Sequence, residues 1–242
     1  MRVSLDKTSD FYIPPNQRLI VALDVPNIYE AKSLVDKLGS TVEFYKIGLE
    51  LATTRDYFDL LNWLTNQGKS VFADLKLYDV PATVSAAVRQ LRNSGATFLT
   101  VHGDKSIMEA AASEKGDLQI LAVTVLTSMD NEDLKQMGIG LDVEDLVLER
   151  AKLAISSGCD GVIASGLEVQ TLRQTLGNEA TIVTPGIRPA DSSVVDDQKR
   201  IVTPKSAFED GTNYIVVGRP IRNAIDPKSM AETIQAEIAA AI

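Results

Sequence analysis

The sequence predicts an α/β protein built as a closed (β/α)8 TIM barrel, and three observations support this fold class. Short runs of β-branched apolar residues recur along the 242 residues, and segments with helical periodicity separate them. Alternating strands and helices are typical of parallel sheets joined by crossover helices. Eight such units in about 250 residues are the usual size of one barrel domain. No linker or low-complexity stretch divides the chain, so we expect a single domain over residues 1–242.

Eight segments have the composition of buried strands, because each is short, apolar and rich in β-branched residues. In chain order they are Arg18–Asp24, Glu43–Gly48, Ser70–Lys76, Thr97–Gly103, Leu118–Thr127, Gly161–Ser165, Thr181–Pro185 and Tyr214–Gly218.

Segments between these strands carry apolar residues at spacings of three and four, as one face of an amphipathic helix requires. The clearest early examples are Ala31, Leu34, Val35 and Leu38, followed by Tyr57, Leu60, Leu61 and Leu64. Later helices are expected at Val143–Ser157 and Ser229–Ile242. Asp142 is the expected N-cap of the first of these, because its carboxylate can accept hydrogen bonds from the free amides of the first turn.

The alternative architecture is an open, doubly wound sheet. That fold usually has a Gly-rich phosphate-binding turn after its first strand, and here the first strand runs into Asp24-Val25-Pro26-Asn27. Gly138-Ile139-Gly140 is too short to be a dinucleotide-binding fingerprint and indicates a flexible turn. The closed barrel is therefore favoured.

The composition excludes several classes of protein. A net charge of −9 disfavours broad contacts with a nucleic-acid backbone. The chain lacks a run of about 18 apolar residues, so we expect no membrane span. The first residues show no apolar core of a secretory signal, and a single cysteine, Cys159, suits a reducing compartment. We expect a cytoplasmic protein that binds neither nucleic acid nor membrane.

His102 is the only histidine. Zinc sites with several His or Cys ligands therefore cannot form within one chain. A serine triad would depend on His102 alone, and no G-x-S-x-G motif accompanies a serine. Carboxylates, lysines and arginines must then carry any chemistry, and we expect neither a cofactor nor a metal. His102 itself is expected to be a hydrogen-bonded wall of the site rather than an acid or base.

Charged residues end the first three predicted strands, at the carboxyl edge where barrel enzymes place their active sites. Asp24 ends the first strand, Lys46 lies near the end of the second, and Asp74 and Lys76 end the third. Since side chains alternate between the two faces of a strand, each of these charges shares a face with the apolar residue two positions before it. A salt-bridged strand end that merely closes the barrel mouth is the alternative, but stability clusters belong at the opposite face.

The third strand runs into Asp74-Leu75-Lys76-Leu77-Tyr78-Asp79-Val80-Pro81-Ala82-Thr83. This stretch resembles the signature D-x-K-x-x-D-[IV]-P-x-T of the orotidine 5′-phosphate decarboxylase family. The resemblance spans nearly the whole chain and one departure is visible, since Tyr78 stands where the family often has histidine. Further matching motifs are Ala22-Leu23-Asp24, Lys46-Ile47-Gly48, Leu126-Thr127-Ser128, Pro185-Gly186-Ile187-Arg188-Pro189, Asp197-Gln198 and Val217-Gly218-Arg219-Pro220.

The resemblance implies a cofactor-independent decarboxylation of orotidine 5′-phosphate to uridine 5′-phosphate in de novo pyrimidine biosynthesis. It makes Lys76 the proton donor to C6 of the pyrimidine and Asp74 the neighbour of the substrate carboxylate, with Lys46 and Asp79 completing the charged network. It also implies a homodimer in which Asp79 and Thr83 reach into the partner's site. The other expected substrate contacts are Asp24 and Lys46 at the ribose, Thr127 and Ser128 at the pyrimidine edge, and Arg188, Gln198, Gly218 and Arg219 at the phosphate.

Residues 186–200 are long, polar and rich in Asp and Ser, as expected of a loop that closes over a phosphate. Two alternative functions stay open on the sequence alone. One is a Mg²⁺-dependent sugar-phosphate decarboxylase or aldolase of the same barrel group, which shares D-x-K-x-x-D; the continuation to Thr83 and the pair Thr127-Ser128 argue against it. The other is a non-catalytic phosphate-binding barrel, which the complete set of Asp and Lys residues disfavours.

Overall fold

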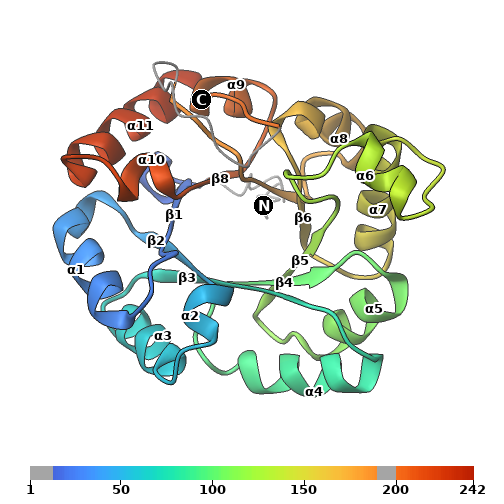
Figure 1. The fold of residues 1–242 in the computed structure, drawn as a ribbon, viewed down its shortest axis with the longest axis horizontal. Helices are drawn as coiled ribbons and strands as arrows, with labels where there is room; N and C mark the ends of the chain where they lie inside the picture. The colour runs from blue at the N-terminus through green and yellow to red at the C-terminus, as the bar shows by residue number, and fades with distance from the viewer. Residues whose placement is uncertain (1–12, 190–199) are drawn as a thin grey trace, which may run out of the picture.

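A computed structural model describes residues 13–189 and 200–242. Within these residues, eight parallel strands pair in sequence order, and β1 pairs with β8 to close the barrel. The helices form a ring around the strands (Figure 1). The expected fold class is confirmed, and the open doubly wound sheet is excluded by the pairing that closes the barrel.

The strands are short. They are β1 (Leu19–Ala22), β2 (Phe44–Gly48), β3 (Ser70–Leu77), β4 (Phe98–His102), β5 (Gln119–Val123), β6 (Gly161–Ile163), β7 (Thr181–Thr184) and β8 (Tyr214–Val217). The α-helices are α1 (Ile28–Leu38), α2 (Leu49–Ala52), α3 (Tyr57–Asn66), α4 (Pro81–Leu91), α5 (Lys105–Glu114), α6 (Asn131–Gln136), α7 (Val143–Ser156), α8 (Val169–Leu176), α9 (Pro204–Glu209), α10 (Arg219–Arg222) and α11 (Pro227–Ala241). Single 3-10 turns are η1 (Pro15–Gln17), η2 (Gly39–Thr41) and η3 (Gly166–Glu168).

Two apolar layers hold the barrel together. One lies inside it and is built from the inward side chains of the strands, namely Ile20, Ala22, Phe44, Phe72, Phe98, Leu121, Val183 and Val216. The other lies between the strands and the helices and contains the intervening strand residues, such as Val21, Tyr45 and Ile47. This alternation confirms that Ala22, Phe44 and Phe72 face the barrel axis, as the period of two requires.

The predicted helices form where the apolar spacing placed them. α1 buries Ala31, Leu34, Val35 and Leu38, and α3 buries Tyr57, Leu60, Leu61 and Leu64. Asp142 caps α7 by accepting a hydrogen bond from the amide of Asp145. The last helix starts at Pro227 rather than Ser229, because Asp226 caps it. None of the described helices is long and apolar enough to cross a bilayer.

Several predicted strands extend too far at their carboxyl ends. β1 ends at Ala22 rather than Asp24, β5 ends at Val123 rather than Thr127, and β6 ends at Ile163 rather than Ser165. The last residues of these segments leave the parallel ladder and become the loops at the mouth of the barrel. Asp24 and Thr127 therefore reach the mouth from loops, which is where residues of barrel active sites are usually found.

Candidate active site

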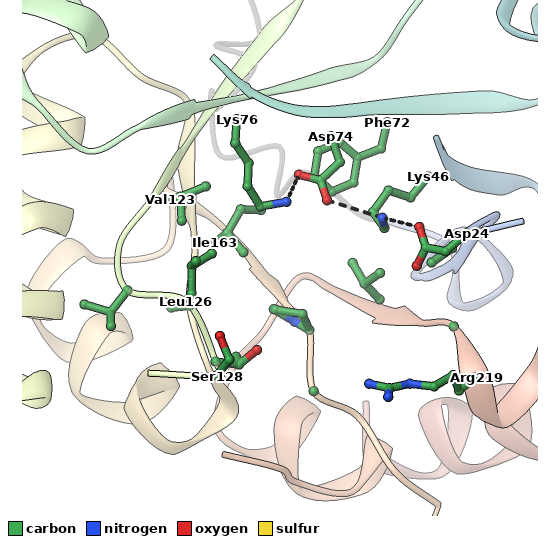
Figure 2. Close-up of a pocket in the computed structure, with 18 of the residues that line it drawn as sticks. Asp24, Lys46, Phe72, Asp74, Lys76, Val123, Leu126, Ser128, Ile163 and Arg219 are labelled. Atoms are coloured by element: carbon green, nitrogen blue, oxygen red, sulfur yellow. Dashed lines mark hydrogen bonds and ion pairs between the residues drawn. The ribbon is translucent and has the colours of Figure 1, made fainter. Parts of the chain in front are cut away.

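A pocket with a volume of about 450 Å³ lies at the carboxyl ends of the strands, a size suited to a small organic ligand (Figure 2). Nine residues expected from the sequence line it: Asp24, Lys46, Asp74, Lys76, Thr127, Ser128, Arg188, Gly218 and Arg219. The other lining residues are Ala22, Phe72, Val123, Val125, Leu126, Ile163, Ala164, Pro185, Gly186, Val216 and Arg222. The lining of the pocket thus combines charged and hydroxyl side chains with apolar ones.

Four charged side chains form a continuous array along one wall of the pocket. The Lys46 Nζ atom lies 2.9 Å from the Asp24 Oδ1 atom and 3.3 Å from the Asp74 Oδ2 atom. The Lys76 Nζ atom lies 2.7 Å from the other Asp74 oxygen, Oδ1. The order Asp24, Lys46, Asp74, Lys76 therefore alternates in sign from the loop after β1 across β2 to the end of β3, as Figure 2 shows.

The charges of the two central groups sustain each other. Burial alone would raise the pKa of Asp74, but the ammonium groups of Lys46 and Lys76 and the hydrogen bonds from Lys76 and Thr100 hold that pKa below its ordinary value. Burial would likewise lower the pKa of Lys46, yet the Asp74 and Asp24 carboxylates raise it. Both groups are therefore charged at neutral pH despite their burial.

The close approach of these groups depends on a glycine. Gly48, at the end of β2, has no side chain to fill the space beside the array. A β-carbon at Gly48 would lie 3.0 Å from the Lys46 Nζ atom and 3.5 Å from the Asp24 Oδ1 atom. A β-carbon there would crowd the Lys46 ammonium group, which would have to shift by a few tenths of an ångström.

The third strand departs from regular geometry at the array. Lys76 has a φ of 48°, and within the described residues it is the only non-glycine with a positive φ. The pairing of β3 with β4 shifts register between Ala73 and Leu77. The Lys76 amide donates to the Thr100 hydroxyl at 3.0 Å instead of to a strand carbonyl. The simple alternation of faces thus predicted the correct wall for Lys76 but not its backbone conformation.

Arginines also line the pocket, outside the charged array. Figure 2 shows the Arg219 side chain across the cavity from the Asp74–Lys76 pair. Arg219 begins α10, directly after Gly218. Arg188 lines the same pocket and is buried, with its Nη1 atom donating to the Ile187 carbonyl at 2.7 Å. A cationic region next to a glycine backbone suits an anion such as phosphate.

Arg222 is a further cation of this region that sequence reasoning missed. It lines the pocket and donates a hydrogen bond to the main-chain carbonyl of Asp24. It lies at the end of the short helix that begins at Arg219, so the motif at residues 217–220 stops two residues before it. Its position one helical turn after Arg219 is the signal that could have identified it.

The loop after β5 forms a second wall. Leu126, Thr127 and Ser128 line the pocket, and Thr127 is buried. Arg200 holds this loop from behind: its Nη2 atom donates to the carbonyls of Val125 and Leu126 at 3.1 and 3.2 Å.

Arg200 also forms a buried ion pair with Glu168, whose pKa is raised by burial and lowered only in part by the arginine. Arg200 was expected only as the end of the polar segment 186–200, and Glu168 was not expected near the site. No local pattern marks this pair, because its members lie 32 residues apart.

Three expected site residues are not among those that line the pocket. Asp79 and Thr83 are exposed at the start of α4, and the Asp79 carboxylate accepts from the Val80 amide at 2.6 Å. Gln198 lies outside the described residues.

His102 is not a wall of the pocket, contrary to expectation; its ring packs against Tyr78 with 4.7 Å between ring centroids. His102 is the last residue of β4, and its ring turns to Tyr78 on the neighbouring β3–α4 loop. Across the described residues, no cluster of three or more His, Cys, Asp or Glu side chains could hold a metal.

Comparison with known proteins gives consistent matches. Residues 17–234 match the model of the Orotidine 5′-phosphate decarboxylase / HUMPS family. The chain is 55% identical over 226 residues to the orotidine 5′-phosphate decarboxylase of Methylococcus capsulatus, and the aligned region covers 93% of each chain. It is 50% identical over 229 residues to the orotidine 5′-phosphate decarboxylase of Stenotrophomonas maltophilia, and the aligned region covers 94% of this chain and 95% of the relative.

Among solved structures, the fold is similar to the crystal structure of orotidine 5′-phosphate decarboxylase from Lactobacillus acidophilus. The TM-score is 0.81 and the sequence identity is 38%, over 92% of this chain and 99% of the other.

Proposed function

The chain belongs to the orotidine 5′-phosphate decarboxylase / HUMPS family and decarboxylates orotidine 5′-phosphate, a step of pyrimidine biosynthesis, and we propose that Lys46, Asp74 and Lys76 carry the reaction. One observation above all supports this assignment. The Asp74 carboxylate lies between two ammonium groups in the wall of an open pocket rather than inside a packed core. A salt bridge that served only stability would not need to line a cavity.

The chemistry requires a cation beside the reacting carbon. Loss of carbon dioxide from C6 leaves an electron pair in the plane of the pyrimidine ring, where the ring π system cannot delocalise it. The Lys76 ammonium group stabilises that charge electrostatically and then donates a proton to C6. Each C6–carboxylate bond that breaks is thus replaced by a C6–H bond, and Lys76 recovers its proton from solvent.

Asp74 opposes the substrate carboxylate. Two unit charges about 4 Å apart repel by about 4 kcal/mol at an effective dielectric constant of 20. This repulsion disappears as the substrate carboxylate becomes neutral carbon dioxide. Because Asp74 is kept ionised by Lys46 and Lys76, it acts on the substrate as a full negative charge.

The other parts of the substrate are its ribose, its pyrimidine edge and its phosphate, and further pocket residues bind each of them. Asp24 and Lys46 bind the ribose hydroxyls, and Thr127 and Ser128 bind the pyrimidine edge. At the other end, Arg188, Gly218 and Arg219 bind the phosphate dianion, and the same role is proposed for Gln198, which lies outside the described residues. Arg219 lies across the cavity from the Asp74–Lys76 pair, and Asp24 lies beside Gly218, which supports this orientation.

The metal-dependent alternative makes a different prediction. Treatment with a chelator should leave the rate of carbon dioxide release from orotidine 5′-phosphate unchanged, because the Lys76 ammonium group rather than a metal stabilises the carbanion. The same protein supplied with Mg²⁺ should release none from 3-keto-gulonate 6-phosphate. The measurement is carbon dioxide release from each substrate before and after chelation. A rate of carbon dioxide release that falls on chelation and returns with Mg²⁺ would favour the metal-dependent sugar-phosphate enzyme. Binding of orotidine 5′-phosphate without release of carbon dioxide would favour a non-catalytic barrel.

We further propose that the chain acts as a homodimer with shared active sites. Asp79 and Thr83 are exposed at the mouth of the barrel rather than in their own pocket, as residues that serve a partner's site would be. Tyr78 and Val80, which flank Asp79, are also exposed and would be buried by a second copy.

We also propose that the whole chain forms one catalytic domain. Its single cysteine supports a cytoplasmic location.

Mixing two inactive variants tests this proposal. Lys76→Ala and Asp79→Ala homodimers should each be nearly inactive. In a heterodimer of the two, one site carries both substitutions and the other carries neither. Random exchange of equal amounts gives about half heterodimers, so activity per site should return to about a quarter of the native value. An absence of recovery after verified exchange would mean that Asp79 acts within its own chain.

A further inference from the structure

Thr100 lies on β4 at the point where β3 departs from regular pairing. On one side of the irregularity Ala73 pairs with Leu99, and on the other Leu77 pairs with Val101. Three residues of β3, numbers 74–76, therefore lie opposite the single residue Thr100. Thr100 is completely buried and is absent from the pocket lining, so it lies behind the charged array.

The Thr100 hydroxyl contacts both members of the array that β3 supplies. It accepts a hydrogen bond from the Lys76 main-chain amide at 3.0 Å and donates its proton to the Asp74 Oδ1 atom at 2.8 Å. The same carboxylate oxygen accepts from the Lys76 Nζ atom at 2.7 Å. One hydroxyl thus closes a ring of hydrogen bonds through the main chain and side chain of Lys76 and the carboxylate of Asp74.

One contact stabilises the unusual backbone conformation of Lys76, and the other restricts the Asp74 carboxylate. Lys76 has a left-handed backbone conformation, which L-residues adopt only when their surroundings impose it. Its amide has left the strand ladder and would be an unsatisfied buried donor without another acceptor. The carboxylate of Asp74 could rotate about its own side chain, and a third donor restricts that rotation.

We propose that Thr100 is a positioning residue of the decarboxylation, whose hydroxyl fixes the Lys76 backbone and the Asp74 carboxylate in the arrangement that the reaction needs. The proposal rests on the function proposed above for the array, and it adds a residue that does not touch the substrate. Thr100 acts through Asp74 and Lys76, because the only described polar contacts of its hydroxyl are with them.

A hydroxyl that donates to Asp74 also favours the ionised carboxylate. The titratable groups around Asp74 are Lys46 from β2, Lys76 from β3 itself and the Tyr57 phenol from α3, and Asp24 lies beyond Lys46. Thr100→Val removes the hydroxyl and leaves the charges of these partners unaltered. Loss of the hydrogen bond should therefore raise the pKa of Asp74, and the acidic limb of the pH dependence of kcat/KM should move to higher pH.

The test compares Thr100→Val, which keeps the shape and removes the hydroxyl, with Thr100→Ser, which keeps the hydroxyl. Thr184→Val is the matched control, because Thr184 is a fully buried threonine on β7 whose hydroxyl bonds to that of Thr212 and does not line the pocket. Thr100→Val should lower kcat at least tenfold with a small change in KM and shift the acidic limb upward. Thr100→Ser should recover most of the rate, and Thr184→Val should leave kcat and the pH profile unchanged.

A direct titration of the Asp74 carboxyl carbon by NMR separates this proposal from the proposed function. An inactive native protein would refute the function, while a raised pKa of Asp74 in Thr100→Val would still support the role of the hydroxyl. Thr100→Ala provides the same comparison if Thr100→Val does not fold. A pKa and a pH profile that match the native protein, or a kcat loss that Thr184→Val reproduces, would overturn the proposal.

Discussion

Replacing Lys76 by alanine is expected to abolish turnover while the barrel remains folded. The substitution removes the ammonium group that both stabilises the carbanion and donates the proton. General acid catalysis contributes about 10²- to 10⁴-fold and an electrostatic contact in an active site about 10²- to 10³-fold, so the loss should be roughly 10⁴-fold or more. Lys46 cannot substitute for it, because its ammonium group is held between Asp24 and Asp74. The measurements are the steady-state rate and the thermal unfolding midpoint.

His102→Asn is the control for this variant. His102 is the only histidine, so it is the residue that a conventional acid–base mechanism would use. It packs on Tyr78 rather than lining the pocket, and burial lowers its pKa, which keeps it neutral at pH 7. His102→Asn should therefore retain most of the activity. The assignment of the acid would be wrong if His102→Asn were inactive and Lys76→Ala active.

Arg219→Ala is expected to lower kcat/KM for orotidine 5′-phosphate by orders of magnitude, although Arg219 lies across the pocket from Lys76. Binding energy from a remote part of the substrate is used to assemble the site around the reacting group, so its loss appears in the transition state. Orotidine without the phosphate should react very poorly with the native protein, and Arg219→Ala should affect that slow reaction much less. The measurement is kcat/KM for both substrates with both proteins.

Arg89→Ala is the matched control, because Arg89 forms an exposed ion pair with Glu114 outside the pocket. It should change neither substrate's kcat/KM. If Arg219→Ala slowed orotidine and orotidine 5′-phosphate by the same factor, the arginine would be supporting the structure of the site rather than binding phosphate.

Much of this architecture could be predicted from local sequence patterns. The period of two along the strands placed Ala22, Phe44 and Phe72 inside the barrel, and the spacing of three and four placed the buried faces of the helices. Since parallel strands in a closed barrel present their carboxyl ends at one edge, the charges that follow them had to meet there. The array from Asp24 to Lys76 follows from these two rules alone.

The remainder depends on contacts between distant segments. The register shift at residues 74–76 is fixed by how β3 fits against β4, so neither the positive φ of Lys76 nor the role of Thr100 is visible in the motif around them. The Arg200–Glu168 pair depends on two loops meeting behind a third. Strand ends were predicted too long because residues such as Leu23, Val125 and Thr127 are β-compatible in composition but lie beyond the last residue of the strand.

The central claim is that this pocket decarboxylates orotidine 5′-phosphate at the charged array, and the most direct test is the ultraviolet absorbance of that substrate. Decarboxylation removes the carboxylate substituent from the ring, which shifts the absorption band and lowers the absorbance at its long-wavelength edge, where the reaction is followed. On adding catalytic amounts of the purified native protein, we expect the absorbance to fall until the substrate is consumed, with one carbon dioxide released per molecule. An absorbance that stays constant with correctly folded protein, in any concentration of substrate, would contradict the account.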